Sequence, residues 1–155
     1  MSLSKDLFAD RLKKRNRPRT KVPVPELSEE GGEEEYLCVE ELTAEELAGV
    51  YELQDERKKA GKNGLKQFGS FTQHLVGLSL VDDKTGARFY ANLMDIKKGM
   101  VGISHPILNR LFEACLELNK VDEKSAEELR KNSESDLENG SGSNSDEKQD
   151  AASPS

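Results

Sequence analysis

Residues 104–119 constrain the fold more than any other stretch, because their start, apolar pattern and end all indicate the same helix. Six apolar residues recur at the spacing of one helical face: Ile107, Leu108, Leu111, Phe112, Cys115 and Leu118. Ser104 is suited to cap the helix with its hydroxyl, Pro106 to occupy the first turn, and Asn119 to end the helix in the left-handed conformation. We therefore expect residues 104–119 to form a core helix.

Other local patterns predict a mainly helical domain with a small β component. Thr43 and Glu46 have the spacing of a capping box, which starts a helix that reaches about Ala60. Its expected buried face consists of Ala44, Leu47, Ala48 and Tyr51. The remaining expected elements are extended chain at 22–27, set by Pro18, Pro23 and Pro25, a strand at 36–39, helices at 65–79, 93–100 and 121–132, and a hairpin at 80–90 that turns at Gly86. Whether the strand pairs with the hairpin stays open.

The first 60 residues divide into a basic and an acidic block. Seven basic residues occur with no acid among them: Arg11, Lys13, Lys14, Arg15, Arg17, Arg19 and Lys21. From Glu26 to Glu56 every charged residue is acidic. The basic block is interpreted either as an arm that binds phosphate or an acidic protein surface, or as a solvated, mobile segment. Attraction between the two blocks, within one chain or between copies, favours head-to-tail self-association into a homo-oligomer.

Composition predicts one domain with two tails. The chain has 155 residues, of which 34% are hydrophobic and 34% are charged. Residues 1–21 are expected to form an N-terminal helix with a stripe of Leu3, Leu7, Phe8 and Leu12, followed by the basic arm. Residues 22–132 form the compact helical domain. Residues 133–155, rich in Ser and acidic residues, have too few apolar side chains to offset the entropy of ordering, so a disordered tail is expected.

No catalytic, cofactor-binding or metal-binding set emerges from the residue pattern, so we do not expect an enzyme. His74 and His105 have no partners at ligand spacing, and Cys38 and Cys115 are interpreted as small buried hydrophobes of a reducing cytosol. The chain has no apolar run of roughly 18 residues, so no membrane helix is expected. A net charge of -7 argues against a dedicated nucleic-acid-binding protein.

Four segments in this order resemble the tail assembly chaperones of long-tailed siphophages, of the lambdoid type. The segments are Leu42–Glu46, Val81–Phe89, Leu111–Asn119 and Glu127–Ser133, the last one preceding a polar tail. The resemblance covers roughly residues 22–133, and the basic arm at 11–21 has no counterpart in the family pattern. It implies a non-structural protein of the host cell cytoplasm that is absent from the mature virion. Such a protein binds the tape measure protein, keeps it soluble and promotes polymerisation of the tail tube around it.

The resemblance also implies that a longer form, made by ribosomal frameshifting, recruits the tail tube protein. We expect the surface that binds the partner to use apolar residues in excess of what so small a core needs: Phe68, Phe71, Leu78, Met94, Met100, Val101 and Ile103. The competing interpretation is that all seven belong to the core. The basic residues from Arg11 to Arg19 are assigned to self-association or to a charged arm. An alternative function is a nucleic-acid-associated regulator that uses this arm together with Arg57–Lys66.

Overall fold

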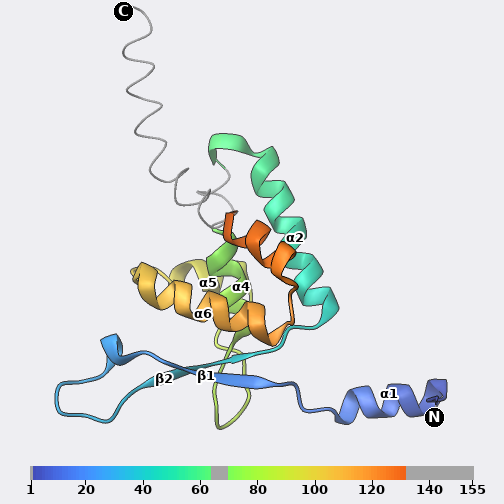
Figure 1. The fold of residues 1–155 in the computed structure, drawn as a ribbon. Coiled ribbons are helices and arrows are strands. Elements are labelled where there is room, and N and C mark those ends of the chain that lie inside the picture. The colour runs from blue at the N-terminus through green and yellow to red at the C-terminus, as the bar shows by residue number, and fades with distance from the viewer. Residues whose placement is uncertain (1, 64–69, 132–155) are drawn as a thin grey trace, which may run out of the picture.

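The computed structural model describes residues 2–63 and 70–131 of the chain (Figure 1). The elements in chain order are α1 (Lys5–Lys14), β1 (Arg19–Pro23), the 3-10 helix η1 (Pro25–Leu27), β2 (Tyr36–Glu40), α2 (Ala44–Lys59), the 3-10 helix η2 (Gly61–Asn63), α4 (Phe71–Ser79), β3 (Leu80–Val81), α5 (Leu93–Gly99) and α6 (His105–Leu118). A last helix covers 123–131. The expected class, mainly helical with a small β component, is confirmed. The expected helix start at 65 and the tail at 133–155 lie outside the described residues.

The three strands form one antiparallel sheet with β2 in the centre. Lys21 pairs with Cys38 in the β1–β2 ladder, and Cys38 pairs with Val81 in the β2–β3 ladder. The pairing that the sequence left open is therefore present. The sequence predicts only extended chain from Val22, whereas the structure contains the strand β1, which ends at Pro23 on the edge of the sheet, where a missing N–H is tolerated. The boundary expected between residues 21 and 22 falls inside this strand.

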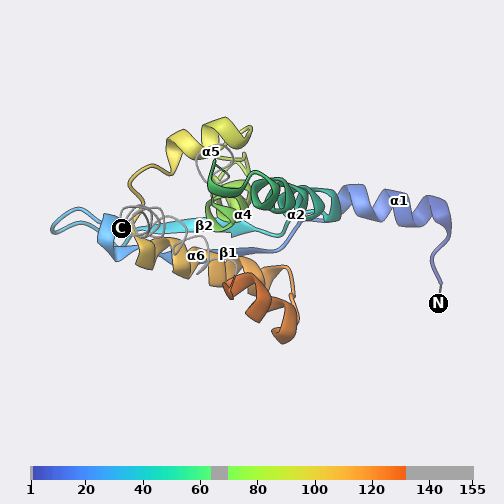
Figure 2. The same ribbon diagram turned by 90° about the horizontal axis from the view of Figure 1, so that it is seen from above.

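The core lies between the sheet and the helices that cover one of its faces (Figures 1 and 2). The central helix α6 was predicted correctly, and its Leu111, Phe112 and Cys115 are almost fully buried. The Phe112 ring meets the Phe71 ring of α4 edge-on, with centroids 6.4 Å apart. Val39 of β2 and Val76 of α4 complete the centre of the core.

Both ends of α6 differ from the expected capping. The Ser104 side chain makes no capping hydrogen bond. At the other end Lys120, not Asn119, has the left-handed conformation, with φ 50°. The N–H of Val121 then donates to the carbonyl of Leu116, and the N–H of Lys120 to that of Glu117, which is a Schellman end without glycine. The Asn119 amide is used elsewhere: it donates to the Cys115 carbonyl and accepts from the N–H of Leu42.

Helix α2 starts with the predicted capping box of Thr43 and Glu46 but buries another face than expected. Its buried residues are Val50, Gln54 and Arg57, while Ala44, Ala48 and Tyr51 are exposed and Leu47 is half-buried. The Arg57 guanidinium donates to the Gln54 side chain at 2.6 Å. Two long polar side chains that share a hydrogen bond are thus buried here, so the apolar pattern alone pointed to the wrong face.

Candidate functional site

An apolar pocket lies at the end of the molecule opposite α1. It has a volume of about 480 Å³ and is lined by η1, the end of the β3 hairpin and the connection between α5 and α6. The lining residues are Glu26, Leu27, Leu37, Leu80, Phe89, Tyr90, Gly99, Met100, Val101, Gly102, Ile103, Ser104 and Ile107. This volume exceeds that of one aromatic side chain and lies in the range of ligand pockets, roughly 300–1,000 Å³.

The turn after α5 shapes one wall of the pocket. Asn92 caps the start of α5 by accepting from the N–H of Asp95, and Gly102, with φ +83°, reverses the chain before α6. At Gly99 a Cβ atom would overlap the Tyr90 ring, so only glycine allows the ring to lie against the helix end. These local requirements position the segment 100–103 at the mouth of the pocket.

Three exposed apolar side chains surround the mouth. Val101 is 79% exposed, Leu27 is 58% exposed and Phe89 is 44% exposed. Met100 is buried and forms part of the lining. An open apolar pocket with exposed apolar side chains at its rim is suited to hold an apolar side chain of a partner.

The structure buries several of the predicted partner-binding residues. Phe71 and Met100 are 3% exposed and belong to the core; this corrects the assignment of Phe71 to a surface, whereas Met100 also lines the pocket. Leu78 is half-buried against the core. For Phe71 and Leu78 the reason is that α4 packs on both α6 and the sheet, which leaves it little free surface.

Of the other predicted residues, Val101 and the half-buried Ile103 meet Met100 at the pocket. Met94 is 56% exposed on α5 but does not line the pocket. Phe68 lies outside the described residues.

Sequence reasoning missed Leu27, Phe89 and Tyr90 as members of this surface. The available signal was the adjacent aromatic pair Phe89–Tyr90 at the end of the expected hairpin, where the structure has no regular strand and both residues line the pocket. The two rings meet edge-on with centroids 6.1 Å apart. For Leu27, which approaches the pocket only through the fold, no local signal exists.

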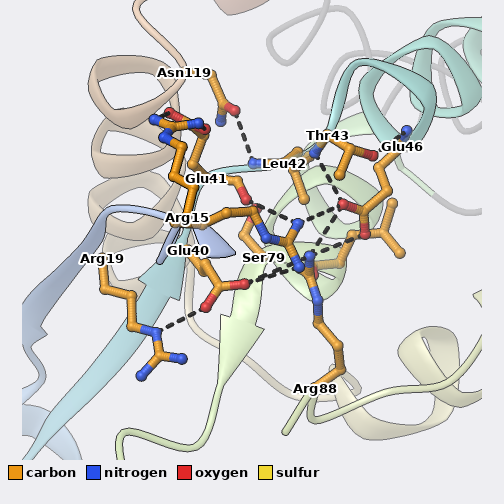
Figure 3. A network of polar contacts seen from close by, with 12 residues as sticks. Arg15, Arg19, Glu40, Glu41, Leu42, Thr43, Glu46, Ser79, Arg88 and Asn119 are labelled. Carbon is orange, nitrogen blue, oxygen red and sulfur yellow. Dashed lines mark hydrogen bonds and ion pairs between the residues drawn. The ribbon is translucent and has the colours of Figure 1, made fainter. Parts of the chain in front are cut away.

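Most of the basic arm is paired within the chain (Figure 3). Arg15 contacts the Glu41 carboxylate at 2.9 Å. Arg17 contacts Glu40 at 3.0 Å and Glu46 at 2.9 Å, and Arg19 contacts Glu40 at 2.7 Å. Attraction between the basic and acidic blocks therefore operates inside the chain, and it fixes the arm to β2 and to the start of α2.

Arg88 joins this network from the β3 hairpin. Its guanidinium lies 2.9 Å from Glu46 and 3.9 Å from Glu40, and it donates to the carbonyl of Leu78. Burial raises the pKa of the Glu46 carboxyl, but the N–H of Thr43 and the Arg88 and Arg17 cations outweigh it, so this pKa lies below its usual value. The carboxylate is thus held charged between two arginines and a helix start.

Of the remaining basic residues of the arm, Lys21 of β1 lies 3.5 Å from the Asp83 carboxylate, and the others lie on α1. Lys14 pairs with Asp10 at 3.0 Å, four residues earlier on the exposed helix. Arg11 and Lys13 have no partner among the residues that the structure describes. Arg57 is buried, so it cannot contribute to the basic surface that the alternative function, a nucleic-acid-associated regulator, would need. Lys66 lies outside the described residues.

Cys38 and Cys115 are free and buried. Burial raises the pKa of the Cys115 thiol to about 11, against the effect of its hydrogen bond with Ser79. Within residues 2–63 and 70–131, no three His, Cys, Asp or Glu side chains gather as a metal-binding group. None of the described helices has the length and apolar character needed to cross a membrane.

No family model, curated protein or solved structure matches this chain significantly.

Proposed function

We propose that this protein is a phage tail assembly chaperone whose pocket binds an apolar side chain of the helical tape measure protein. The open apolar pocket with Val101, Leu27 and Phe89 exposed at its rim is the observation that carries the proposal. A long helix that is not yet packed in the tail exposes repeated apolar side chains. Many copies of a small protein, each holding one such side chain, would keep the helix soluble.

The charge distribution supports a protein partner over nucleic acid. The net charge is -7, and Arg15, Arg17 and Arg19 are already paired with carboxylates of the same chain. Binding a phosphate backbone would require these arginines to leave their partners. In the proposed role the protein acts in the host cytoplasm, leaves the tail before the virion matures, and uses a longer form to recruit the tail tube protein.

The test is co-expression with the tape measure protein, followed by measurement of how much of that partner is soluble and co-purifies. The variant Val101→Asp places a charge at the pocket mouth, and losing one buried apolar contact of about 1.5–3 kcal/mol should weaken binding by about tenfold or more. Ala48→Asp is the matched control, because Ala48 is exposed on α2 outside the pocket. A tape measure protein that stays insoluble with the unaltered chaperone, while the chaperone binds nucleic acid at about 0.15 M salt, contradicts the proposal.

A further inference from the structure

Helix α1 carries an apolar face that no other part of residues 2–63 and 70–131 covers. Leu7, Phe8 and Leu12 lie on adjacent rows of the helix, and Leu3 precedes its cap; all four are exposed, Phe8 by 53%. The helix has 10 residues, none of them buried, and is capped by Ser4. An isolated helix of this length is marginal in water, even with a good cap, and becomes stable when its apolar face is packed.

Charges at the two ends of the molecule complement each other. On α1, Lys5, Arg11 and Lys13 have no partner among the described residues. At the opposite end the loop 28–35 follows η1, next to the pocket, and carries five carboxylates with no cation partner in the described part of the chain: Glu29, Glu30, Glu33, Glu34 and Glu35. Figures 1 and 2 show α1 and this loop at opposite ends in both views, so one copy cannot bring them together.

We propose that α1 of one copy docks in the pocket of a second copy, with Phe8 between Val101 and Leu27. The pocket volume of about 480 Å³ accommodates an aromatic side chain together with part of a leucine. In this position the free cations of α1 approach the acidic loop 28–35 of the second copy. The contact is heterologous, because it joins two different surfaces. A chain of copies therefore keeps one free α1 at one end and one free pocket at the other, and it can go on growing.

This self-association goes beyond the proposed function and does not require it. Because the pocket holds one occupant, α1 and an apolar side chain of a client would exclude each other. If the proposed function is also correct, α1 of another copy occupies the pocket until the client, the tape measure protein, displaces it. A variant with a defective α1 then binds the tape measure protein more tightly than the unaltered protein does at the same concentration.

The experiment is sedimentation velocity of the full chain over a range of concentrations, without any client. We expect the unaltered protein to associate with increasing concentration. Phe8→Asp, which disables the helix, and Val101→Asp, which disables the pocket, should each weaken self-association by about tenfold or more. Ala9→Asp is the matched control, since Ala9 lies on the opposite face of α1 and the charge change is the same.

Mixing the two defective variants gives the decisive result. The Phe8→Asp copy retains a pocket and the Val101→Asp copy retains α1, so the mixture should form a 1:1 dimer that grows no further. If pairing were between two α1 helices, the Val101→Asp variant would still associate with itself and would form no 1:1 complex with Phe8→Asp, and that outcome overturns the proposal. Leu27→Asp, at the other side of the pocket mouth, replaces Val101→Asp if the latter fails to fold.

Two further outcomes also overturn the proposal. One is an unaltered protein that stays monomeric at every concentration, and the other is an Ala9→Asp variant as defective as Phe8→Asp. A monomeric protein that binds vesicles of anionic lipid through Phe8 would assign α1 to a membrane surface instead. Since no client is present, failure here leaves the chaperone proposal standing, and failure of client binding leaves this assay unaffected.

Discussion

Replacing Glu40 by glutamine should destabilise the fold although the side chain keeps its size. The Glu40 side chain is 6% exposed and lies 2.7 Å from the Arg19 Nε atom and 3.0 Å from an Arg17 nitrogen, with Arg88 at 3.9 Å. Glutamine leaves no cavity, but it removes the charge and turns an amide donor toward guanidinium donors. The loss therefore comes from electrostatics and hydrogen bonding alone.

The size of the stability loss depends on how far the arginine partners of Glu40 are exposed to solvent. Hydrogen bonds to charged groups contribute about 1.5–3 kcal/mol when well shielded, and exposed ion pairs about 0.2–1 kcal/mol. The arginine side chains around Glu40 retain between 23% and 38% of their exposure, so each of the two short contacts lies between these limits. We expect Glu40→Gln to lower the free energy of unfolding by about 2 kcal/mol.

Urea unfolding followed by circular dichroism measures this change, and the slope m should stay the same because the exposed surface is unchanged. Glu41→Gln is the matched control: its partner Arg15 is 52% exposed, so the expected change is within about 0.5 kcal/mol. If Glu40→Gln changes stability by no more than Glu41→Gln does, the network does not hold the arm in the way described.

Three further predictions concern the core. Gly77→Ala should destabilise the protein by about 1–3 kcal/mol, because the new Cβ would lie 2.5 Å from a methyl carbon of Ile96. Gly49→Ala, with open space around it, should instead stabilise α2 by up to about 1 kcal/mol. Urea unfolding of both variants measures the sign of each change. Cys115 should react with a thiol reagent at pH 8 only as fast as the protein unfolds, since its thiol is buried with a pKa of about 11, and rapid native-state labelling would contradict its placement. Burial lowers the pKa of His74 below 6.5, so the unfolded state binds the proton more tightly and the free energy of unfolding should fall as the pH drops below 6.5. In His74→Gln the urea midpoint should depend less on pH between pH 7.5 and 5.5. An unchanged pH dependence would show that His74 is not the cause.

Elements defined by contacts within a few residues were predictable from the sequence. The apolar stripe of α6, the capping box at Thr43 and the turn at Gly86 all depend on neighbours along the chain, and the structure contains each of them. The strand β1 was not predicted, because it pairs with β2, a distant segment, from Arg19 opposite Glu40 to Pro23 opposite Tyr36. No pattern within a few residues indicates such a pairing. The end of α6 was misassigned for a related reason: Asn119 reaches Leu42, a contact that only the fold creates.

The candidate site was predictable only in part. Val101 and Ile103 were chosen as apolar residues in excess of what so small a core needs, and both line the pocket. Phe71 stood out for the same apolar character but is buried, since side-chain type does not reveal which face of α4 packs on α6. Leu27 and Phe89 come from segments far apart in sequence, so their proximity follows from the sheet and the loops around it.

Photo-crosslinking from the pocket mouth tests the central claim most directly. A benzophenone amino acid placed at position 101 during co-expression should crosslink this protein to the tape measure protein, and the same group at position 48, on the exposed side of α2, should not. The Phe8→Asp background prevents α1 of another copy from occupying the pocket, so the expected crosslink to the tape measure protein should increase there. No crosslink from position 101, or an equal yield from position 48, would contradict the proposal that this pocket holds the client.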